Sequence, residues 1–474
     1  MKGIVSSARR SLSGEDIYTI IGEGKVFISR SDKHLELYDS VEFTEDPQGD
    51  SKNPSIIVES RSPGSHAACF EAIGKMLSGS LSNSLLALGI SQFDSIAEKM
   101  KGQMFAAAER IARSVESGSP IVLRFHNDGD GSSGAIAFYN AISSMQENFI
   151  GKLVSVSYRI NKSISYAQSS LWSDKLFFNT FESVEKPLVI IIDFGTSEQS
   201  YEAIDSIKDI DLVWIDHHPL PKDFPLSKIP IYISPWLSGG DSNQTAGALA
   251  CVLASMLTKM PEAKLKYLAE LSRISLISDH SEFAPKSQIE SEKALVLDHI
   301  TSKKLRFSDS SEPSLTPKSM DEVLKDELKW KEMFRKAREQ LDEAIRVGIK
   351  HAKHYKSTLG FKIVELDFGH VSALDYSILP GRYSSKLHDE MHDLLKEDVV
   401  LVVHYANNIS IRLDKKISKS INLLEVIERM KEREPFVLNG GGHMEAASIK
   451  VENGYIEKAL DILFEELGAD RSPN

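Results

Sequence analysis

Three short apolar runs constrain the fold of this chain more than any other feature. They are IVLRF (121–125), LVIII (188–192) and DLVWI (211–215). Nearly continuous apolar runs are typical of strands buried on both faces of a parallel sheet, because half-exposed strands alternate apolar and polar residues. The segments between the runs are long enough for the crossovers that parallel strands need. We therefore expect an α/β domain whose parallel sheet is flanked by helices.

Each apolar run ends in residues that can carry chemistry. His126-Asn127-Asp128 follow the first run, Asp193 the second, and Asp216-His217-His218 the third. In open α/β sheets the ligand binds beyond the carboxyl ends of the strands, so we expect these side chains along one edge. Gly129 lets the chain turn between Asp128 and Asp130. The stretch 131–134, GSSG, is expected to begin a helix whose free N–H groups favour anions.

The acids and imidazoles have the composition of a divalent-metal site. Carboxylates with some imidazole suit Mn²⁺ or Mg²⁺. Four aspartates exceed what one ion with an open position needs and suit two ions about 3.5–4 Å apart with one shared Asp. Two such ions polarise a phosphoryl oxygen and activate water, which is the apparatus for hydrolysing a phosphate ester. The predicted ligands are His126, Asp128, Asp130, Asp193, His217 and Asp279.

Each motif alone also fits an ordinary structural role. D-G-D is usually a turn, and an Asp after an apolar run is often a helix N-cap. D-H-H could be a surface loop, Asp279 could end a helix, and G-G-G-H could be a flexible turn. The conjunction of all five motifs in this order favours the metal site.

Length and composition exclude several classes of protein. A chain of 474 residues predicts two or three domains. No apolar run approaches the roughly 20 residues that span a bilayer, so we expect no membrane association. Cys69 and Cys251 cannot supply a disulfide framework or a cysteine zinc site, which fits a reducing cytoplasm. The net charge of −12 argues against unspecific coating of nucleic acid but not against a local basic groove.

The remaining sequence suggests how the chain is divided. Weak alternation over 1–45 predicts a few strands, and the composition of 46–65 predicts a loop. Apolar periodicity predicts a helix over 92–116, buried helices over 243–258 and 266–278, and a long amphipathic helix after a linker at 303–319. A smaller α/β unit starts near 357. Its expected elements are strands in FKIVELDF, VVLVVHY and SIRL, a helix at 421–432, the loop NGGGHM, a strand and a last helix at 455–467.

The order of these motifs closely resembles the DHH–DHHA1 phosphoesterases. The resemblance runs from about 118 to 467, and the wording FHNDGDGSSGA is similar to the archaeal RecJ-like nucleases, especially the Hef-associated nuclease branch. It implies four parts: an N-terminal extension (1–100), a DHH catalytic domain (101–317), a connecting helix (318–356) and a smaller α/β DHHA1 domain that binds substrate (357–474). The motifs are H-x-D-x-D-G at 126–131, Asp193, DHH at 216–218, Asp279 in LISD, and GGGH at 440–443.

The resemblance also implies residue roles. Asp128 and His126 would bind one ion, whereas Asp130, His217 and Asp279 would bind the other, with Asp193 bridging the two. Asp216 would orient His217, and His218 would stabilise the charge of the scissile phosphate. In the second domain, substrate phosphate would be held by Gly440, Gly441, Gly442, His443 and Arg412, with Arg382 as a further candidate that also fits a surface arginine.

Two departures from the family pattern bear on these roles. His126 stands two residues before Asp128, where the pyrophosphatase branch has its His four residues before, so a pyrophosphatase is disfavoured and ligation by His126 is open. Ser448 replaces a glycine that often follows the GGGH motif, which could change how the end of the substrate fits.

The function that the resemblance implies is a metal-dependent exonuclease of single-stranded DNA or RNA. It would use two Mn²⁺ or Mg²⁺ ions, release mononucleotides with 3′→5′ polarity, and act in replication or repair. Two alternatives remain: an oligoribonuclease or dinucleotide phosphodiesterase, and a non-catalytic Cdc45-like replication scaffold. The N-terminal region could contact partners such as GINS- or Hef-like proteins, or nucleic acid. Tyr232, Trp236, Tyr376 and Tyr383 could stack on bases but equally fit core or rim packing.

Overall fold

The structure is a computed structural model, and it describes most of residues 1–471. The residues outside the description are 11–15, 23–24, 31–33, 37–38, 47–54, 64–92, 149–153, 182–185, 258–260, 303–314, 375–376, 443 and 472–474. Two compact units make up the chain, one of residues 1–291 with 316–321 and the other of 292–315 with 322–474. Within the described residues no helix has both the length and the apolar character needed to cross a membrane. The four-part division stays a prediction.

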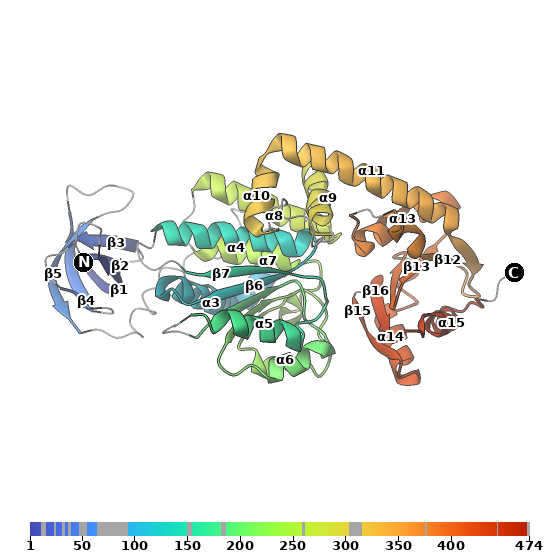
Figure 1. The fold of residues 1–474 in the computed structure, drawn as a ribbon, viewed down its shortest axis with the longest axis horizontal. Helices are drawn as coiled ribbons and strands as arrows, with labels where there is room; N and C mark the ends of the chain where they lie inside the picture. Colours follow the sequence, from blue (N-terminus) through green and yellow to red (C-terminus); the bar gives the residue numbers. More distant parts are fainter. Residues whose placement is uncertain are drawn as a thin grey trace. The chain divides into compact units, whose positions relative to one another are not determined.

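The N-terminal part of the first unit is a five-stranded antiparallel sheet (Figure 1). Its strand order is β3-β2-β1-β4-β5. The two outer strands also meet, because Ser29 Oγ on β3 donates a hydrogen bond to the Ile56 carbonyl on β5 at 3.3 Å. The strands are β1 (Lys2–Arg10), β2 (Asp16–Gly22), β3 (Lys25–Arg30), β4 (Ser40–Glu45) and β5 (Ile56–Ser62).

The prediction of a loop over 46–65 was wrong for its second half. Ile56–Ser62 forms β5, with Ile56 and Val58 buried and Ile57 exposed. This alternation is the pattern of a strand with one buried face, and the surrounding Pro, Gly and Ser residues obscured it.

A parallel sheet forms the centre of the first unit, as the three apolar runs predicted. The strand order is β10-β9-β8-β6-β7, and every neighbouring pair is parallel. All five residues of β8 are buried, which fits a strand covered on both faces. The strands are β6 (Ile121–His126), β7 (Val156–Asn161), β8 (Leu188–Ile192), β9 (Asp211–Ile215) and β10 (Ile231–Ile233).

Helices cover both faces of this sheet (Figure 1). On one face, α5 and α6 pack in an apolar cluster around Trp214. On the other face lie α4, α7 and α8, which also pack against one another. The helices of this unit include α3 (Asp94–Ser117), α4 (Gly129–Asn148), α5 (Gln168–Phe178), α6 (Tyr201–Asp205), α7 (Ala246–Leu257) and α8 (Glu262–Ser278), and the short helix η4 spans Pro235–Ser238.

The second unit is a separate α/β body with a six-stranded mixed sheet. Its strand order is β11-β12-β13-β14-β16-β15, in which only the β12–β13 pair is parallel. The strands are β11 (Lys353–Lys356), β12 (Lys362–Asp367), β13 (Val399–Tyr405), β14 (Asn408–Leu413), β15 (Val437–Gly442) and β16 (Ala446–Val451).

Helices of the second unit pack on this sheet through two apolar clusters. The predicted amphipathic helix is α11, and the predicted helices near 421–432 and 455–467 are α14 and α15. The boundary between the units falls within α9 and α10 along the chain. The helices are α9 (Gln288–Ser302), α10 (Pro317–Lys325), α11 (Glu327–His351), α12 (Gly369–Ser372), α13 (Pro380–Leu395), α14 (Leu423–Arg433) and α15 (Ile456–Glu466).

The glycine-rich segment NGGGHM is not the loop that we expected at its start. Gly440, Gly441 and Gly442 are the last residues of β15, the edge strand, and pair with Ile449, Ser448 and Ala447 of β16. Glycine gives no strand signal in a sequence, so the pairing with β16 decides the structure here.

Candidate metal centre

The carboxyl ends of β6 and β8 bring together the first group of predicted ligands. His126 ends β6, and its Nδ1 atom lies 2.5 Å from Asp128 Oδ2 and 3.6 Å from Asp193 Oδ2. Asp128 Oδ1 accepts a hydrogen bond from the Gly131 N–H, so the first turn of α4 fixes this carboxylate. A Cβ on Gly131 would lie 2.6 Å from the His126 carbonyl oxygen. Only glycine therefore lets α4 start this close to the end of β6.

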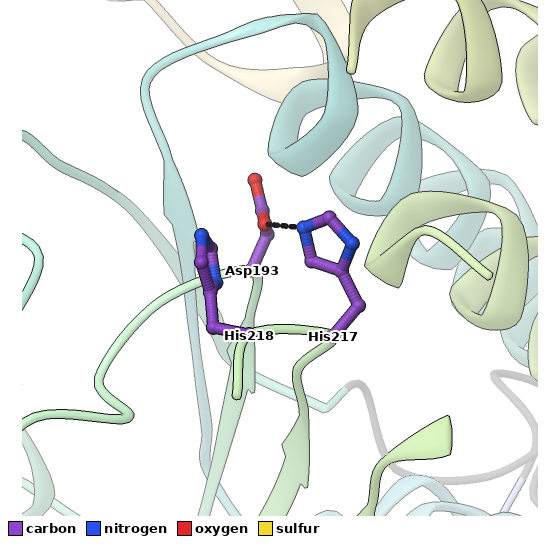
Figure 2. Close-up of side chains that lie close together, drawn as sticks. All are labelled: Asp193, His217 and His218. Atoms are coloured by element: carbon purple, nitrogen blue, oxygen red, sulfur yellow. Dashed lines mark ion pairs between the residues drawn. The ribbon is translucent and has the colours of Figure 1, made fainter. Parts of the chain in front are cut away.

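A second group of ligands surrounds the buried imidazole of His217. Its Nε2 atom lies 3.3 Å from Asp193 Oδ1, 3.4 Å from Asp279 Oδ2 and 3.9 Å from Asp130 Oδ2. Figure 2 shows the Asp193 carboxylate facing this ring, with His218 beside it. The four residues come from the ends of β8 and β9, from α4 and from the residue that ends α8.

Asp193 belongs to both groups. Ligand atoms of His126, Asp128 and Asp193 lie within 4.8 Å of one another, and so do those of Asp193, His217 and His218. The backbone of Asp193 adopts φ of +66°, a left-handed conformation that is uncommon for a residue other than glycine. Its N–H donates to the Ile215 carbonyl at 2.9 Å, so pairing with β9 holds the strained residue in place.

The buried carboxylate of Asp130 sits at the start of α7. Its Oδ2 atom accepts the Ala246 N–H at 3.1 Å, and Oδ1 accepts the Gly247 N–H at 2.9 Å. The Ser275 hydroxyl on α8 also donates to Oδ1. The first N–H groups of a helix have no partner within the helix, so Asp130 satisfies them while α7 and α8 fix its orientation.

The two neighbouring histidines have different supports, and one predicted role was wrong. Asp216 contacts His218, with Oδ1 2.7 Å from His218 Nδ1, instead of orienting His217. The Thr196 hydroxyl donates to the other oxygen of Asp216. The ring of His217 is held by the Ser242 carbonyl, 2.8 Å from its Nδ1 atom. Successive residues at a strand end point in opposite directions, whereas residues two apart point the same way. Asp216 therefore contacts His218 and not the adjacent His217.

The ionisable side chains at this edge of the sheet shift one another's pKa values. Burial alone would raise the pKa of Asp193, but hydrogen bonds from His126 and His217 hold it well below its usual range. Burial and the charge of Asp193 raise the pKa of Asp130, and they raise that of Asp279 to about 6, although His217 opposes both shifts. Burial alone would lower the pKa of His217, but Asp279, Asp193 and Asp130 raise it well above its usual range.

The donor set fits divalent cations. It offers oxygen atoms from Asp128, Asp130, Asp193 and Asp279 together with imidazole nitrogens, a combination that suits Mn²⁺ or Mg²⁺. Buried carboxylates at this spacing need compensating positive charge, which a bound cation supplies as well as a protonated imidazole does.

The predicted substrate residues lie in the second unit. Arg412 on β14 contacts α13, since its Nε atom lies 3.3 Å from Ser385 Oγ and its side chain also reaches the Gly381 carbonyl at 3.4 Å. Ile411, next to Arg412, is in register with Ala447 and through it with Gly442, so Arg412 and the glycine strand share one end of the sheet. His443 lies outside the described residues.

Arg382 is engaged in an ion pair. Its Nε atom lies 2.6 Å from Asp298 Oδ2, and 17% of its side chain is exposed. The contact fixes α13 on α9, which is a structural role, and it uses part of the guanidinium that a substrate phosphate would need. Arg382 stays a weaker candidate than Arg412.

Sequence reasoning did not single out Thr196, Ser242 or Ser275. Thr196 supports Asp216, and the Ser242 carbonyl supports His217. Ser275 carried one signal, because it stands four residues before Asp279 and so faces the same side of α8. Trp236, a residue that is 40% exposed, is also part of the site, since its Nε1 atom donates to the His217 carbonyl at 2.9 Å.

Comparison with known families agrees with the motifs. Residues 120–271, which include β6, α4, β8, β9, α7 and part of α8, match the model described as DHH family, N-terminal domain. This part of the chain therefore matches the DHH family, as the motif order predicted. Its place in the Hef-associated branch stays a prediction.

Three proteins of known sequence or structure are similar to this chain. The uncharacterized protein MJ1198 of Methanocaldococcus jannaschii is 24% identical over 418 residues, which are 77% of this chain and 54% of that protein, so the chain spans about half of its length. A solved DHH-domain structure described as a member of the S1p family of ribosomal proteins, PF0399, has a TM-score of 0.67 at 20% identity, covering 78% of this chain and 91% of that one. This similarity shows the fold. RecJ from Thermus thermophilus in complex with Mn²⁺ has a TM-score of 0.47 at 14% identity, covering 84% of this chain and 59% of that one.

Proposed function

We propose that the chain is a divalent-metal-dependent phosphodiesterase and, more narrowly, an exonuclease of single-stranded DNA or RNA that releases mononucleotides with 3′→5′ polarity in replication or repair. The observation that carries the proposal is the position of Asp193, whose two oxygens face two groups of ligands. A carboxylate shared in this way is the arrangement that a pair of Mn²⁺ or Mg²⁺ ions requires.

Two groups of residues would hold the ions. Asp128 and His126 would bind one, Asp130, His217 and Asp279 the other, and Asp193 both. When bound, such a pair neutralises charge on a phosphoryl group and activates water for in-line displacement. The hydrogen bonds from Ala246, Gly247 and Ser275 to Asp130 keep that ligand in position before any cation arrives.

His218 has a separate role in the proposal. Asp216 contacts its Nδ1 atom. Burial of His218 alone would lower the pKa of its imidazole, but the charge of Asp216 raises this pKa above its usual value. We assign the Nε2 atom to a non-bridging oxygen of the scissile phosphate, where an imidazolium would stabilise developing negative charge. Asp216 and Thr196 would fix the orientation of this ring.

In the second unit, Arg412 and the glycines at the end of β15 would bind a phosphate of the substrate. An arginine fork is suited to phosphate oxygens, and glycine lets a phosphate approach the backbone closely. The N-terminus of α13, next to Arg412, would favour the same negative charge.

The bridging role of Asp193 is tested with Asp193→Asn, which keeps the shape of the side chain and removes its charge. Calorimetric titration with Mn²⁺ should give two ions in the unchanged protein and fewer in the variant, and hydrolysis should fall by at least about 10³-fold because the shared ligand is lost. Asp209→Asn, at an exposed aspartate, is the matched control and should change neither result. An Asp193→Asn protein with normal hydrolysis would contradict the site.

Polarity and substrate class need a second experiment. End-labelled single-stranded DNA and RNA are incubated with the protein and Mn²⁺. A ladder that begins at the 3′ end supports the proposal, whereas release of the 5′-terminal nucleotide reverses the direction. Cleavage restricted to oligomers of two to five residues favours the small-substrate phosphodiesterase. Bound Mn²⁺ without cleavage favours a non-catalytic Cdc45-like role.

A further inference from the structure

Three neighbouring strands of the parallel sheet each place one polar side chain behind His218. Thr196 lies in the loop after β8, Asp216 directly follows β9, and Tyr232 is the middle residue of β10. The Asp216 N–H donates to the Ile233 carbonyl at 3.1 Å, so the contact between β9 and β10 continues past the end of β9. The three side chains are therefore positioned by the sheet itself.

The loop that carries Thr196 is fixed against Trp214 on β9. The Trp214 Nε1 atom donates to the Phe194 carbonyl at 2.8 Å. Gly195 has φ of +102°, and a Cβ at this position would overlap the Trp214 ring, so only glycine lets the loop lie against the indole. The Ser197 N–H donates to the Gly195 carbonyl at 2.8 Å, which closes a tight turn around Thr196. The Thr196 hydroxyl is thus held beside Asp216.

Tyr232 lies in the apolar cluster below this loop. The residue is 3% exposed, so it cannot stack on a base, which was one of the roles that its sequence allowed. Its ring packs against Trp214 and Phe224, with ring centroids 6.0 Å and 5.6 Å apart. A buried tyrosine hydroxyl needs a polar partner, and the Tyr232 oxygen lies 2.8 Å from Thr196 Oγ1.

The direction of each hydrogen bond follows from the number of protons. Thr196 has one hydroxyl proton, which it donates to Asp216 Oδ2. Its oxygen can only accept at its contact with Tyr232, so Tyr232 is the donor there. An ionised carboxylate only accepts, and Asp216 Oδ1 lies 3.2 Å from the His218 backbone nitrogen and 2.7 Å from its Nδ1 atom. The His218 ring therefore carries a proton on Nδ1.

We propose that Tyr232 is a positioning residue for His218 and acts through Thr196 and Asp216. The chain of hydrogen bonds fixes the Asp216 carboxylate, and the carboxylate holds the imidazole with a proton on Nδ1 and with Nε2 on the opposite side of the ring. Hydrogen bonds in a chain polarise one another, so the Tyr232 hydroxyl influences a ring that it does not touch. The expected effect on hydrolysis rests on the proposed function, whereas the positions of the protons do not.

The first test observes His218 directly and needs no hydrolysis. The full-length protein is labelled with nitrogen-15 histidine, and the ring N–H resonances are recorded by NMR without divalent cations. The variant His218→Gln identifies the His218 resonance by its loss. Tyr232→Phe should shift this resonance, because it changes how strongly Asp216 accepts from the ring. Thr196→Val should shift it further, and Thr196→Ser should return it to the parent position because serine keeps the hydroxyl.

The second test measures hydrolysis of a single-stranded oligonucleotide with Mn²⁺. Loss of a residue that supports a functional side chain from behind typically lowers activity by about 10–100-fold. Tyr232→Phe should lower kcat by about 10-fold and Thr196→Val by about 100-fold, with Thr196→Ser close to the parent. KM and the number of bound Mn²⁺ ions should stay unchanged, because neither side chain touches the substrate or a metal ligand.

Tyr201→Phe is the matched control, because it removes another tyrosine hydroxyl at the same apolar cluster. The Tyr201 ring lies 5.9 Å from that of Phe224, and its hydroxyl donates to the exposed Asp223 at 2.8 Å. The control should change neither the His218 resonance nor kcat. Thermal unfolding shows whether each variant keeps its fold. A folded Tyr232→Phe protein with the parent resonance and the parent kcat would overturn the proposal.

Failure of this proposal can be distinguished from failure of the proposed enzyme activity. If the protein hydrolyses nothing, the enzyme activity is refuted, while a shifted His218 resonance in Tyr232→Phe still supports the chain of hydrogen bonds. If the parent hydrolyses the oligonucleotide and Tyr232→Phe leaves the resonance in place, only the positioning role fails. Loss of bound Mn²⁺ in Tyr232→Phe would also overturn that role, because Tyr232 would then act on the metal centre.

Discussion

The contact between Gly247 and Asp130 makes a sharp prediction for Gly247→Ala. Gly247 lies in the first turn of α7, and a Cβ there would be 2.3 Å from the Asp130 carbonyl oxygen and 2.7 Å from its Oδ1 atom. Both atoms belong to the segment that supplies the metal ligands. The added methyl group would have to displace α7 or α4, because the closest atom is backbone.

The magnitude follows from opposing contributions. Alanine favours a helix over glycine by up to about 1 kcal/mol. Against this, forcing a methyl group into a packed contact costs about 1–3 kcal/mol. Displacing the Gly247 N–H, now 2.9 Å from Asp130 Oδ1, loses a hydrogen bond to a charged group, about 1.5–3 kcal/mol. We expect a net destabilisation of the first unit by about 2–4 kcal/mol, with weaker Mn²⁺ binding.

Urea unfolding followed by tryptophan fluorescence measures the stability, since Trp172, Trp214 and Trp236 all lie in the first unit. The control is Gly102→Ala in α3, where an added Cβ meets nothing within 4 Å. It should stabilise by about 0.5–1 kcal/mol. If Gly247→Ala behaves like the control and binds Mn²⁺ normally, α7 does not approach Asp130 as described.

Two further changes test other parts of the chain. Trp236→Leu removes an exposed ring that is hydrogen-bonded to the His217 carbonyl. It should raise KM for an oligonucleotide about tenfold, within the range for one lost stacking contact, and leave Mn²⁺ binding normal. The control Trp172→Leu, at another exposed tryptophan, should change neither KM nor Mn²⁺ binding. Arg471→Met removes both hydrogen bonds of 2.8 Å to the buried Glu365 and should destabilise the second unit by about 2–3 kcal/mol at pH 7. Burial alone would raise the pKa of Glu365, but Arg471 holds it well below its usual range, so this stabilisation is present above the unfolded pKa of about 4.3 and is lost as the pH falls further. Urea unfolding should show a smaller difference in the free energy of unfolding between variant and parent at pH 3 than at pH 7. An equal difference at the two pH values would refute the stabilisation of ionised Glu365 by Arg471.

The sequence predicted the central sheet well because parallel strands covered on both faces leave an unbroken apolar signal. It also predicted that Asp193, His217 and Asp279 would meet, since strand ends and the turn after a buried helix converge at one edge. Burial and motif order were enough for this part of the fold and of the site.

Contacts that depend on the direction of a side chain or on the pairing of two strands could not be predicted from the sequence. Asp216 is adjacent to His217 in sequence and two residues from His218, and only the geometry of the strand end shows that it holds His218. Gly440–Gly442 became a strand because β16 offers a partner, which no local propensity records. Ser242 acts through its backbone carbonyl, a group that every residue possesses, and Thr196 acts through a side-chain hydroxyl like that of many other Ser and Thr residues of the chain.

The left-handed backbone of Asp193 sets a limit on how far this protein can be stabilised. A residue other than glycine in this conformation costs about 1–3 kcal/mol, and the buried carboxylates around it repel one another. Mutations selected only for thermal resistance should therefore accumulate at Asp193, Asp130 and Asp279, where glycine or a neutral residue relieves both costs. A heat-resistant variant obtained in this way would keep the fold and lose the metal centre.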